Sequence, residues 1–280
     1  MDTSHQRALP TITVEPTSGF AAINLRELWH YRDLLFFLVW RDISVRYKQT
    51  VLGAVWVVLQ PFLTMVIFTF IFGRLANMPS EGAPYPIFFF SALVPWQYFS
   101  STLNNSANSL VNNANLISKV YFPRLLIPLS SLFPTLVDWA ISFLVMLGLL
   151  FFYRFGLTWN ALWLPAFLLL LMTTVLGVGL WFSALNIHYR DVRYVVPFIT
   201  QFGMFVSPVV YPSSVLPERW RAVYAANPMV GVIEGFRWAL LGKAALPGRE
   251  IFISTAVALL LLLGGLFYFR RAERHFADIV

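Results

Sequence analysis

Residues 155–187 read FGLTWNALWLPAFLLLLMTTVLGVGLWFSALNI, a stretch without a charged residue that lies between Arg154 and His188. An α-helix rises about 1.5 Å per residue, so about 20 apolar residues cross the roughly 30 Å hydrocarbon core of a bilayer. This stretch is long enough to do so. It therefore predicts a helix that spans a membrane.

Further charge-poor windows of this kind occur along the chain. The window that starts after Glu81 becomes rich in Asn and Ser beyond Phe99, so we count it as one span, because a polar tract is poorly suited to lipid. We expect six membrane-spanning helices, at about residues 51–73, 86–108, 125–153, 161–187, 194–211 and 251–270. The predicted fold class is an all-α integral membrane protein.

The composition agrees with a membrane protein and excludes a soluble one. Hydrophobic residues make up 58% of the chain and charged residues 12%, whereas soluble domains carry about 25% charged residues. The net charge of +7 comes from Lys and Arg between apolar runs, so it does not indicate a nucleic-acid partner. The chain has no Cys, and its four His residues form no metal-binding pair. No metal site and no catalytic residue are predicted.

The basic residues predict the orientation of the spans. An even number of spans places both termini on one side, and Lys and Arg concentrate in cytoplasmic segments. Cytoplasmic termini leave only Arg74 and Arg154 in the short external loops. We therefore expect residues 1–23 to be a mobile cytoplasmic tail and residues 271–280 to be a second cytoplasmic tail.

Residues 24–48 predict an amphipathic helix that lies on the membrane face. Asn24 and Glu27 form a capping-box pattern at its start. Residues 34–40 are apolar on every side but too short to cross, and charged residues follow from Arg41 onward. An interfacial helix that bends into the first span fits this pattern. Simple anchoring of that span and docking of a partner both remain open.

A polar stripe follows the second span. Asn104, Asn108 and Asn112 are spaced four residues apart and so share one side of a helix. Unpaired amides are costly in lipid, so this side must face other helices, water or a protein partner. A helix end that merely emerges into water is the alternative. Residues 119–123 then predict a short basic and aromatic cytoplasmic elbow.

Residues 212–250 form a long connection that is unusually apolar for a loop. Pro217 and Pro228 predict the starts of two short helices, and Asn227 is the expected cap of the second. The second helix, residues 228–241, is too apolar for water and too short to cross a membrane. A re-entrant helix packed on the bundle and an external cap both remain open.

Two charged features lie in apolar surroundings. Glu234 and Arg237 are one turn apart on the second short helix, and removal of one charge would leave the other without its partner. Asp138 is the only acidic residue inside an expected span. A proton relay is possible for such a carboxylate, but a structural hydrogen bond to another helix is favoured, because no second titratable residue lies near it in the apolar windows.

Three motifs resemble a known family. They are RDISVRYKQTVLGAVWVVLQP at residues 41–61, NNANLISKVYFPR at residues 112–124 and NPMVGVIEGFR at residues 227–237. In this order they resemble the permease subunits of type-2 ATP-binding-cassette (ABC) exporters. Within that group they look most like the branch that exports O-antigen, capsule and teichoic acid. The resemblance runs from about residue 24 to the C-terminus.

This resemblance implies a function and a set of partners. The chain would form a homodimer around a channel for a lipid-linked polysaccharide in the bacterial cytoplasmic (inner) membrane. Two copies of a separate ATPase, which bind ATP and Mg²⁺, would attach on the cytoplasmic side, and this chain would bind no cofactor itself. The resemblance places the interface helix at residues 24–48, a coupling helix at 111–122 and external gate helices at 213–242. The exported polymer stays open among O-antigen, capsule and teichoic acid.

The candidate site residues fall into four groups. Those expected to couple to the ATPase are Arg41, Asp42, Arg46, Asn112, Asn113, Asn115 and Lys119. Glu234 and Arg237 are the gate candidates. The aromatic residues proposed to stack on sugar rings in the pore are Trp56, Phe62, Trp96, Tyr98 and Phe99. Arg41, Arg46 and Lys48 are candidates for binding the pyrophosphate of the lipid carrier, with positive-inside anchoring as the alternative.

The chain is not expected to be an enzyme. It has no G-x-x-x-x-G-K-[ST] motif, so ATP hydrolysis must reside in a partner. The competing hypothesis is a membrane-embedded transferase that acts on lipid-linked sugars. Such an enzyme needs a polar catalytic cluster at one membrane face, and only residues 188–193 approach one.

Overall fold

A computed structural model describes residues 25–48, 53–242, 248–273 and 276 of the chain. In these ranges the chain is helical and forms no strand. The predicted tail at residues 1–23, the first residues of the first expected span, and most of the predicted tail at 271–280 lie outside the described residues. The all-helical prediction is confirmed for the part of the chain that is described.

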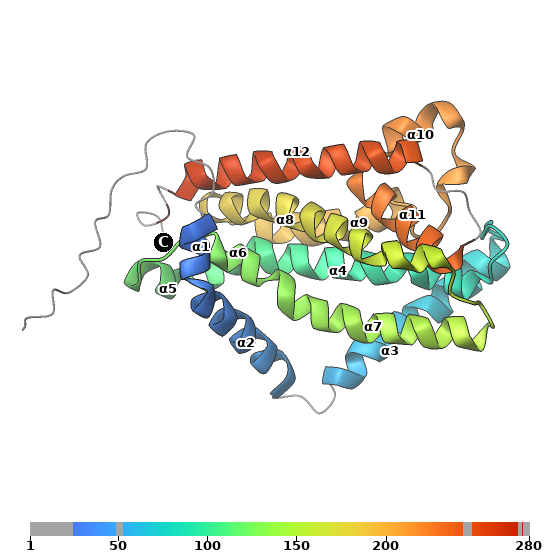
Figure 1. Cartoon of the computed structure of the whole chain (residues 1–280), viewed down its shortest axis with the longest axis horizontal. Coiled ribbons are helices and arrows are strands. Elements are labelled where there is room, and N and C mark those ends of the chain that lie inside the picture. Colours follow the sequence, from blue (N-terminus) through green and yellow to red (C-terminus); the bar gives the residue numbers. More distant parts are fainter. Residues whose placement is uncertain (1–24, 49–52, 243–247, 274–275, 277–280) are drawn as a thin grey trace, which may run out of the picture.

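Most of the helices run along one common direction and form an elongated bundle (Figure 1). The first half of the chain forms α1 (Leu25–His30), α2 (Arg32–Lys48), α3 (Gly53–Phe68), the π-helix η1 (Thr69–Leu75), α4 (Tyr85–Asn112), α5 (Ala114–Lys119), α6 (Leu126–Ser130) and α7 (Leu132–Phe152). The second half forms η2 (Trp159–Trp163), α8 (Leu164–His188), α9 (Val192–Val206), η3 (Ser213–Val215), α10 (Glu218–Tyr224), α11 (Pro228–Leu241) and α12 (Gly248–Glu273).

Four described segments are helical, long and apolar enough to cross a membrane. They are Val55–Leu75, Leu126–Phe152, Trp159–His188 and Gly248–Glu273. Each coincides with one of the spans expected from the sequence. The remaining two expected spans correspond to α4, which is long but more polar, and α9, which is apolar but short.

Helix α4 lies in the middle of the bundle (Figure 1) and packs against α3, α7, α8, α9 and α11. Its side chains are largely buried, and Phe88, Phe89 and Phe90 are fully so. On one flank, α8 and α12 approach closely through glycines. A Cβ atom added to Gly265 would lie 2.6 Å from the carbonyl oxygen of Gly177, so this contact requires glycine.

Helix α9 ends earlier than the expected span at 194–211. The helix stops at Val206, and Ser207 adopts an extended conformation with φ −100° and ψ 158°. Pro208 follows Ser207, and a residue before proline avoids helical angles because its backbone would clash with the proline ring. Residues 207–212 therefore leave the helix and cross the end of the bundle instead.

Two other segments differ in detail from their predicted bounds. The interface helix expected at 24–48 is divided into α1 and α2 at Tyr31, although the Tyr31 backbone N–H still donates to the Glu27 carbonyl. Of residues 111–122, only 114–119 form the separate helix α5, because α4 continues to Asn112 and the chain becomes extended at Val120.

Candidate functional site

The two ends of the bundle hold different polar sites. Helices α1, α2, α5 and α6 gather at one end together with the last turns of α12, whereas α10 and α11 lie at the opposite end (Figure 1). We call these the elbow end and the cap end. The cytoplasmic candidates from the sequence lie at the elbow end, and the gate candidates lie at the cap end.

At the elbow end, Arg41 joins the interface helix to residues 112–123, which we call the elbow from here on. Its Nη1 donates to Asn113 Oδ1 at 2.9 Å, and its Nη2 lies 2.8 Å from Asp42 Oδ1. Asn113 is the residue between α4 and α5, and its own side-chain amide donates to the Ser109 carbonyl at 2.8 Å. Three of the coupling candidates therefore form one contact between α2 and the start of α5.

The remaining coupling candidates on the elbow lie on its surface. Asn112, Asn115 and Lys119 are exposed. Two apolar residues that follow them, Val120 and Tyr121, are 51% and 67% exposed. The elbow is thus a small projecting surface with amide, ammonium and aromatic groups, while its inner residue Ile117 is buried against the bundle.

Arg46 contacts a different helix. Its guanidinium forms an ion pair with Asp138 of α7, and the Tyr47 hydroxyl donates to the second oxygen of the same carboxylate. Burial and this hydrogen bond to Asp138 raise the pKa of Tyr47 above its ordinary value. Asp138 therefore accepts structural hydrogen bonds from another helix, as favoured from the sequence.

The candidates for binding pyrophosphate are consequently not equivalent. Arg41 is engaged by Asp42 and Asn113, and Arg46 is engaged by Asp138. Lys48, at the end of α2, is exposed. The three residues lie on one helix, but the two guanidinium groups have different partners. The contacts described do not bring them and the Lys48 ammonium group together around one phosphate position.

The polar stripe of α4 faces its neighbours in part. The side-chain amide of Asn186 in α8 donates to the Ala107 carbonyl at 2.8 Å and to Asn108 Oδ1 at 3.1 Å. Asn104 and Asn108 donate to carbonyls one turn earlier in α4, those of Ser100 and Asn104. Of the alternatives considered, packing against another helix thus accounts for the Asn108 side.

The aromatic pore candidates divide into exposed and buried residues. On α3, Trp56 is 57% and Phe62 41% exposed. On α4, Trp96, Tyr98 and Phe99 are buried, and the Tyr98 hydroxyl donates to the Leu132 carbonyl of α7. In this conformation the α4 aromatics are largely covered by the chain, whereas the α3 pair is more exposed.

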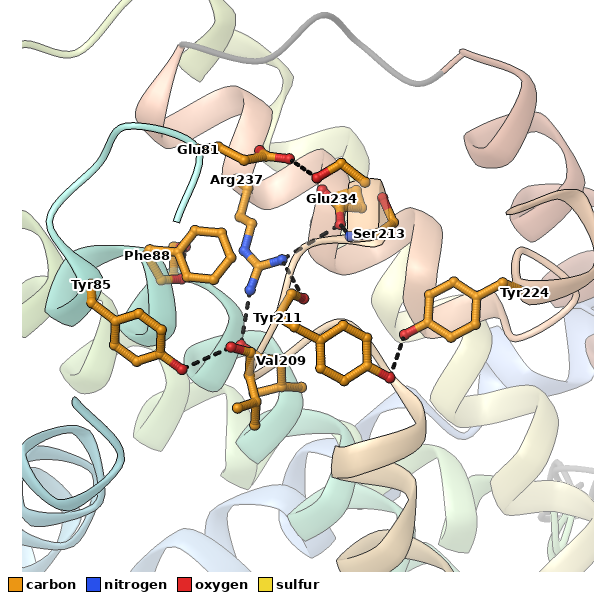
Figure 2. A network of polar contacts seen from close by, with 12 residues as sticks. Glu81, Tyr85, Phe88, Val209, Tyr211, Ser213, Tyr224, Glu234 and Arg237 are labelled. Carbon is orange, nitrogen blue, oxygen red and sulfur yellow. Dashed lines mark hydrogen bonds and ion pairs between the residues drawn. The ribbon is translucent and has the colours of Figure 1, made fainter. Parts of the chain in front are cut away.

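At the cap end, Arg237 of α11 is fully enclosed in a network of polar contacts (Figure 2). Its Nη2 donates to the Val209 carbonyl at 2.9 Å, and its Nη1 lies 3.4 Å from the Tyr211 carbonyl. The guanidinium carbon is 3.7 Å from the centre of the Phe88 ring, a cation–π contact. The ion pair with Glu234 is longer, at 3.5 Å.

Glu234 holds the same crossing segment from a second point. Its Oε1 accepts the backbone N–H of Ser213 at 3.0 Å, and the Tyr85 hydroxyl of α4 donates to the Val210 carbonyl at 2.7 Å (Figure 2). Glu234 and Arg237 thus form the buried pair expected from the sequence, and each also has a partner outside the pair. Backbone groups of residues 209–213 bind both side chains, and we call this segment the crossing segment.

The local sequence explains how α11 presents these residues. The side chain of Asn227 accepts the Met229 N–H at 3.0 Å, Pro228 occupies the first turn, and Gly242 ends the helix with φ +63°. The predicted cap and start of this helix are confirmed. The helix is buried on nearly every side, as its composition indicated.

Some residues of these sites were not identified from the sequence. Tyr47, Phe88 and Ser213 belong to them, and Phe88 gave no signal beyond its place in an aromatic run. Pro208 could have indicated the end of α9, because a residue before proline avoids helical backbone angles. Beyond the end of the helix, backbone carbonyls no longer bond within it and can accept hydrogen bonds from Arg237. Among the residues that the structure describes, no cluster of His, Asp and Glu could hold a metal ion.

The sequence pattern that defines the ABC-2 type transporters matches residues 33–241, a range that begins in α2 and ends in α11. It covers most of the chain and includes α5 and α6 at the elbow end and α10 and α11 at the cap end. The chain belongs to the ABC-2 type transporter family.

Individual relatives agree with this family. The O-antigen export system permease protein RfbA of Myxococcus xanthus is 30% identical over 261 residues, which cover 91% of this chain and 98% of that protein. RfbA of Klebsiella pneumoniae is 31% identical over 251 residues, which cover 89% and 95%. The polysialic acid transport protein KpsM of Escherichia coli is 28% identical over 229 residues, which cover 78% and 82%.

Proposed function

We propose that this chain is the permease subunit of an ATP-driven exporter that moves a lipid-linked polysaccharide of the O-antigen type across the cytoplasmic membrane. The observation that carries the proposal is the near full-length similarity to O-antigen export permeases. The shorter alignment with a polysialic acid transporter makes capsule export the alternative substrate class. Two chains form the channel, and two copies of a separate ATPase supply the energy.

Six spans fit the bundle better than four. Helix α4 has 28 residues and is surrounded by α3, α7, α8, α9 and α11, so it can cross the bilayer without a fully apolar surface. Helix α9 packs against α4 and α8 and exposes Phe198, Phe202 and Phe205. With both counted as spans, α1 and the last turns of α12 fall on the same side, where Leu38 and Phe269 belong to one buried cluster.

The elbow end supplies the surface for the ATPase. Exposed groups on α5 and just after it suit docking into a cleft of a soluble protein, whereas lipid would leave their amide and ammonium groups without partners. The contact from Arg41 to Asn113 joins this surface to the interface helix. A displacement of α5 by the ATPase therefore also moves α2 and, through the contact of Arg46 with Asp138, α7.

The cap end supplies the gate. Helix α11 is too short to cross, is buried, and contacts α4, α8 and α12, so it is re-entrant rather than a surface cap. Arg237 and Glu234 fix the crossing segment against it. Movement of the crossing segment opens the external end of the channel in this proposal.

A topology measurement tests the six-span arrangement. The chain has no Cys, so Ser118→Cys on the elbow and Glu218→Cys on α10, both at exposed positions, carry the only thiols. An impermeant maleimide applied to intact spheroplasts is expected to label position 218 and to label position 118 only after lysis. Labelling of both positions in intact spheroplasts would contradict the placement of the elbow and α10 on opposite sides of the membrane.

Deletion and complementation test the function itself. Loss of the gene in its own host should leave lipid-linked polysaccharide in the inner leaflet, and the wild-type chain should restore surface polymer. Replacing Asn112, Asn113 and Asn115 together with Leu should fail to restore it although the protein inserts and assembles. Asn160→Leu, in η2 at the cap end, is the matched control and should restore export. Normal surface polymer in the deletion strain overturns the proposal.

A further inference from the structure

A cavity of about 320 Å³ lies between α3, α4 and α7. Gln60 and Thr64 line it from α3, Gln97 and Ser101 from α4, and Asp138 and Ser142 from α7. Its volume is at the small end of the range of about 300–1,000 Å³ for small-molecule sites. The cavity is therefore suited to one compact ligand and not to a folded polymer segment.

The polar lining is unusual for this location. The cavity opens to the outside of the bundle, where Gln60 and Ser101 are exposed, and hydrocarbon offers no hydrogen bonds to amides and hydroxyls. A lipid chain in the cavity would leave the groups of Gln60, Gln97 and Ser101 without partners. Water or a ligand with several hydroxyl groups satisfies them.

Aromatic side chains line other parts of the wall, beside aliphatic ones such as Leu93 and Val94. Trp96, Tyr98 and Trp139 all line the cavity. The indole Nε1 of Trp139 is buried and has no hydrogen-bond partner in the described part of the chain. Because this N–H is inaccessible even to water, a ligand in the cavity would contact the indole ring of Trp139 and not its N–H. Flat apolar faces beside amide and hydroxyl groups match the two faces and the rim of a sugar ring.

The charge of the wall selects against charged ligands. Among the described lining residues, Asp138 is the only ionisable acid or base except the phenol of Tyr98, and its carboxylate is already paired with Arg46. No Lys or Arg is among the described lining residues, and the guanidinium next to the wall, that of Arg46, is already paired with Asp138, so the lining favours a neutral ligand over an anionic sugar or a phosphate. The carboxylate can still accept a hydrogen bond from a hydroxyl group.

We propose that this cavity is a binding subsite for one neutral pyranose ring, in which Gln60, Gln97 and Asp138 hydrogen-bond the ring hydroxyls beside Trp139. The proposal rests on the proposed export function and adds the chemical class of the unit that each chain holds. Because Asp138 also contacts Arg46 and Tyr47, a ligand bound to Asp138 changes the contacts of the interface helix.

Thiol protection tests the subsite directly. Ser101→Cys places the only thiol of the full-length chain at an exposed position on the cavity wall, and Ser118→Cys provides the control on the elbow. The chain is reconstituted in nanodiscs free of sugar-based detergent and reacted with N-ethylmaleimide. The probes are the methyl glycosides of glucose, mannose and galactose, with sorbitol as an acyclic polyol.

At least one glycoside is expected to slow the reaction at position 101 about tenfold when it is present at roughly ten times its Kd, and to leave position 118 unchanged. Gln60→Leu in the Ser101→Cys background keeps the Asp138–Arg46 contact and should reduce the protection to less than about twofold. Asp138→Asn should do the same. Equal protection by sorbitol, or none by any of the three glycosides, overturns the subsite.

This measurement requires neither ATP nor the ATPase. Absence of protection therefore leaves the export function standing, and normal surface polymer in the deletion strain leaves a measured subsite standing.

Discussion

Two arginines in this chain pair with carboxylates, and their surroundings differ. Arg46 and Asp138 come from separate helices, and their side chains are 33% and 25% exposed. Arg237 and Glu234 lie one turn apart on α11, and theirs are 2% and 6% exposed. The first pair joins two helices that are far apart in the sequence. The second pair forms hydrogen bonds with the backbone of the crossing segment.

The difference indicates different roles. A partly exposed pair between helices can separate and re-form at low cost, because water compensates each charge. A buried guanidinium cannot lose its carbonyl partners without a large penalty. We therefore expect the contact between Arg46 and Asp138 to open more readily than the contacts at the cap end, which must be broken together.

The largest effect is expected from Arg237→Met. The methionine fills much of the same space but leaves the Val209 and Tyr211 carbonyls and the Glu234 carboxylate without the guanidinium, at a cost of roughly 3–5 kcal/mol. The midpoint of thermal unfolding in detergent should fall, and export should be lost. Arg237→Lys should recover only part of the stability, since an ammonium cannot reach both carbonyls in the same planar geometry.

Glu234 sharpens this result. Glu234→Gln retains an acceptor for the Ser213 N–H and should cost only about 1 kcal/mol. The double change to Met and Gln should be at least as unstable as Arg237→Met alone, because the lost carbonyl contacts are not restored. A double variant that regains stability would show that the two charges depend mainly on each other, contrary to the network in Figure 2.

A smaller effect on stability but a clear one on coupling is expected at Asp138. Asp138→Asn and Arg46→Met should each lower the free energy of unfolding by about 1 kcal/mol, since the pair is partly exposed. Stimulation of ATP turnover by substrate should fall in both. In a double-mutant cycle the two changes should not be additive. Additive losses would place the two residues in separate functions.

Whether a structural feature could be predicted from the sequence depends on how far apart in the chain its residues lie. Four spans and the start of α11 follow from local apolar runs, Asn227 and Pro228. The pairing of Arg46 with Asp138 joins residues 92 positions apart, and no local pattern encodes it. The partners of Arg237 are backbone carbonyls, which every residue possesses, so residue type cannot reveal them. The six-span count and the roles of the site residues remain predictions.

The smallest effect is expected from Asn113→Ala. Arg41 loses one acceptor but keeps Asp42, so the cost should be about 0.5–1 kcal/mol. ATP turnover should fall slightly, and less than with Asp138→Asn. Asn160→Ala is a suitable control at the other end of the bundle. A loss at Asn113 as large as that at Arg237 would mean that the elbow is as rigidly held as the cap.

The burial of α4 also has a consequence for the synthesis of the chain. A ribosome completes α4 before α7, α8 and α11, the helices that cover it, have been made. During that interval the side chains of Asn104 and Asn108 would face lipid, and Asn186, which later binds Asn108, does not yet exist. We therefore expect α4 to remain in the insertion machinery until α8 arrives, so that truncation before α8 releases the nascent chain to membrane proteases.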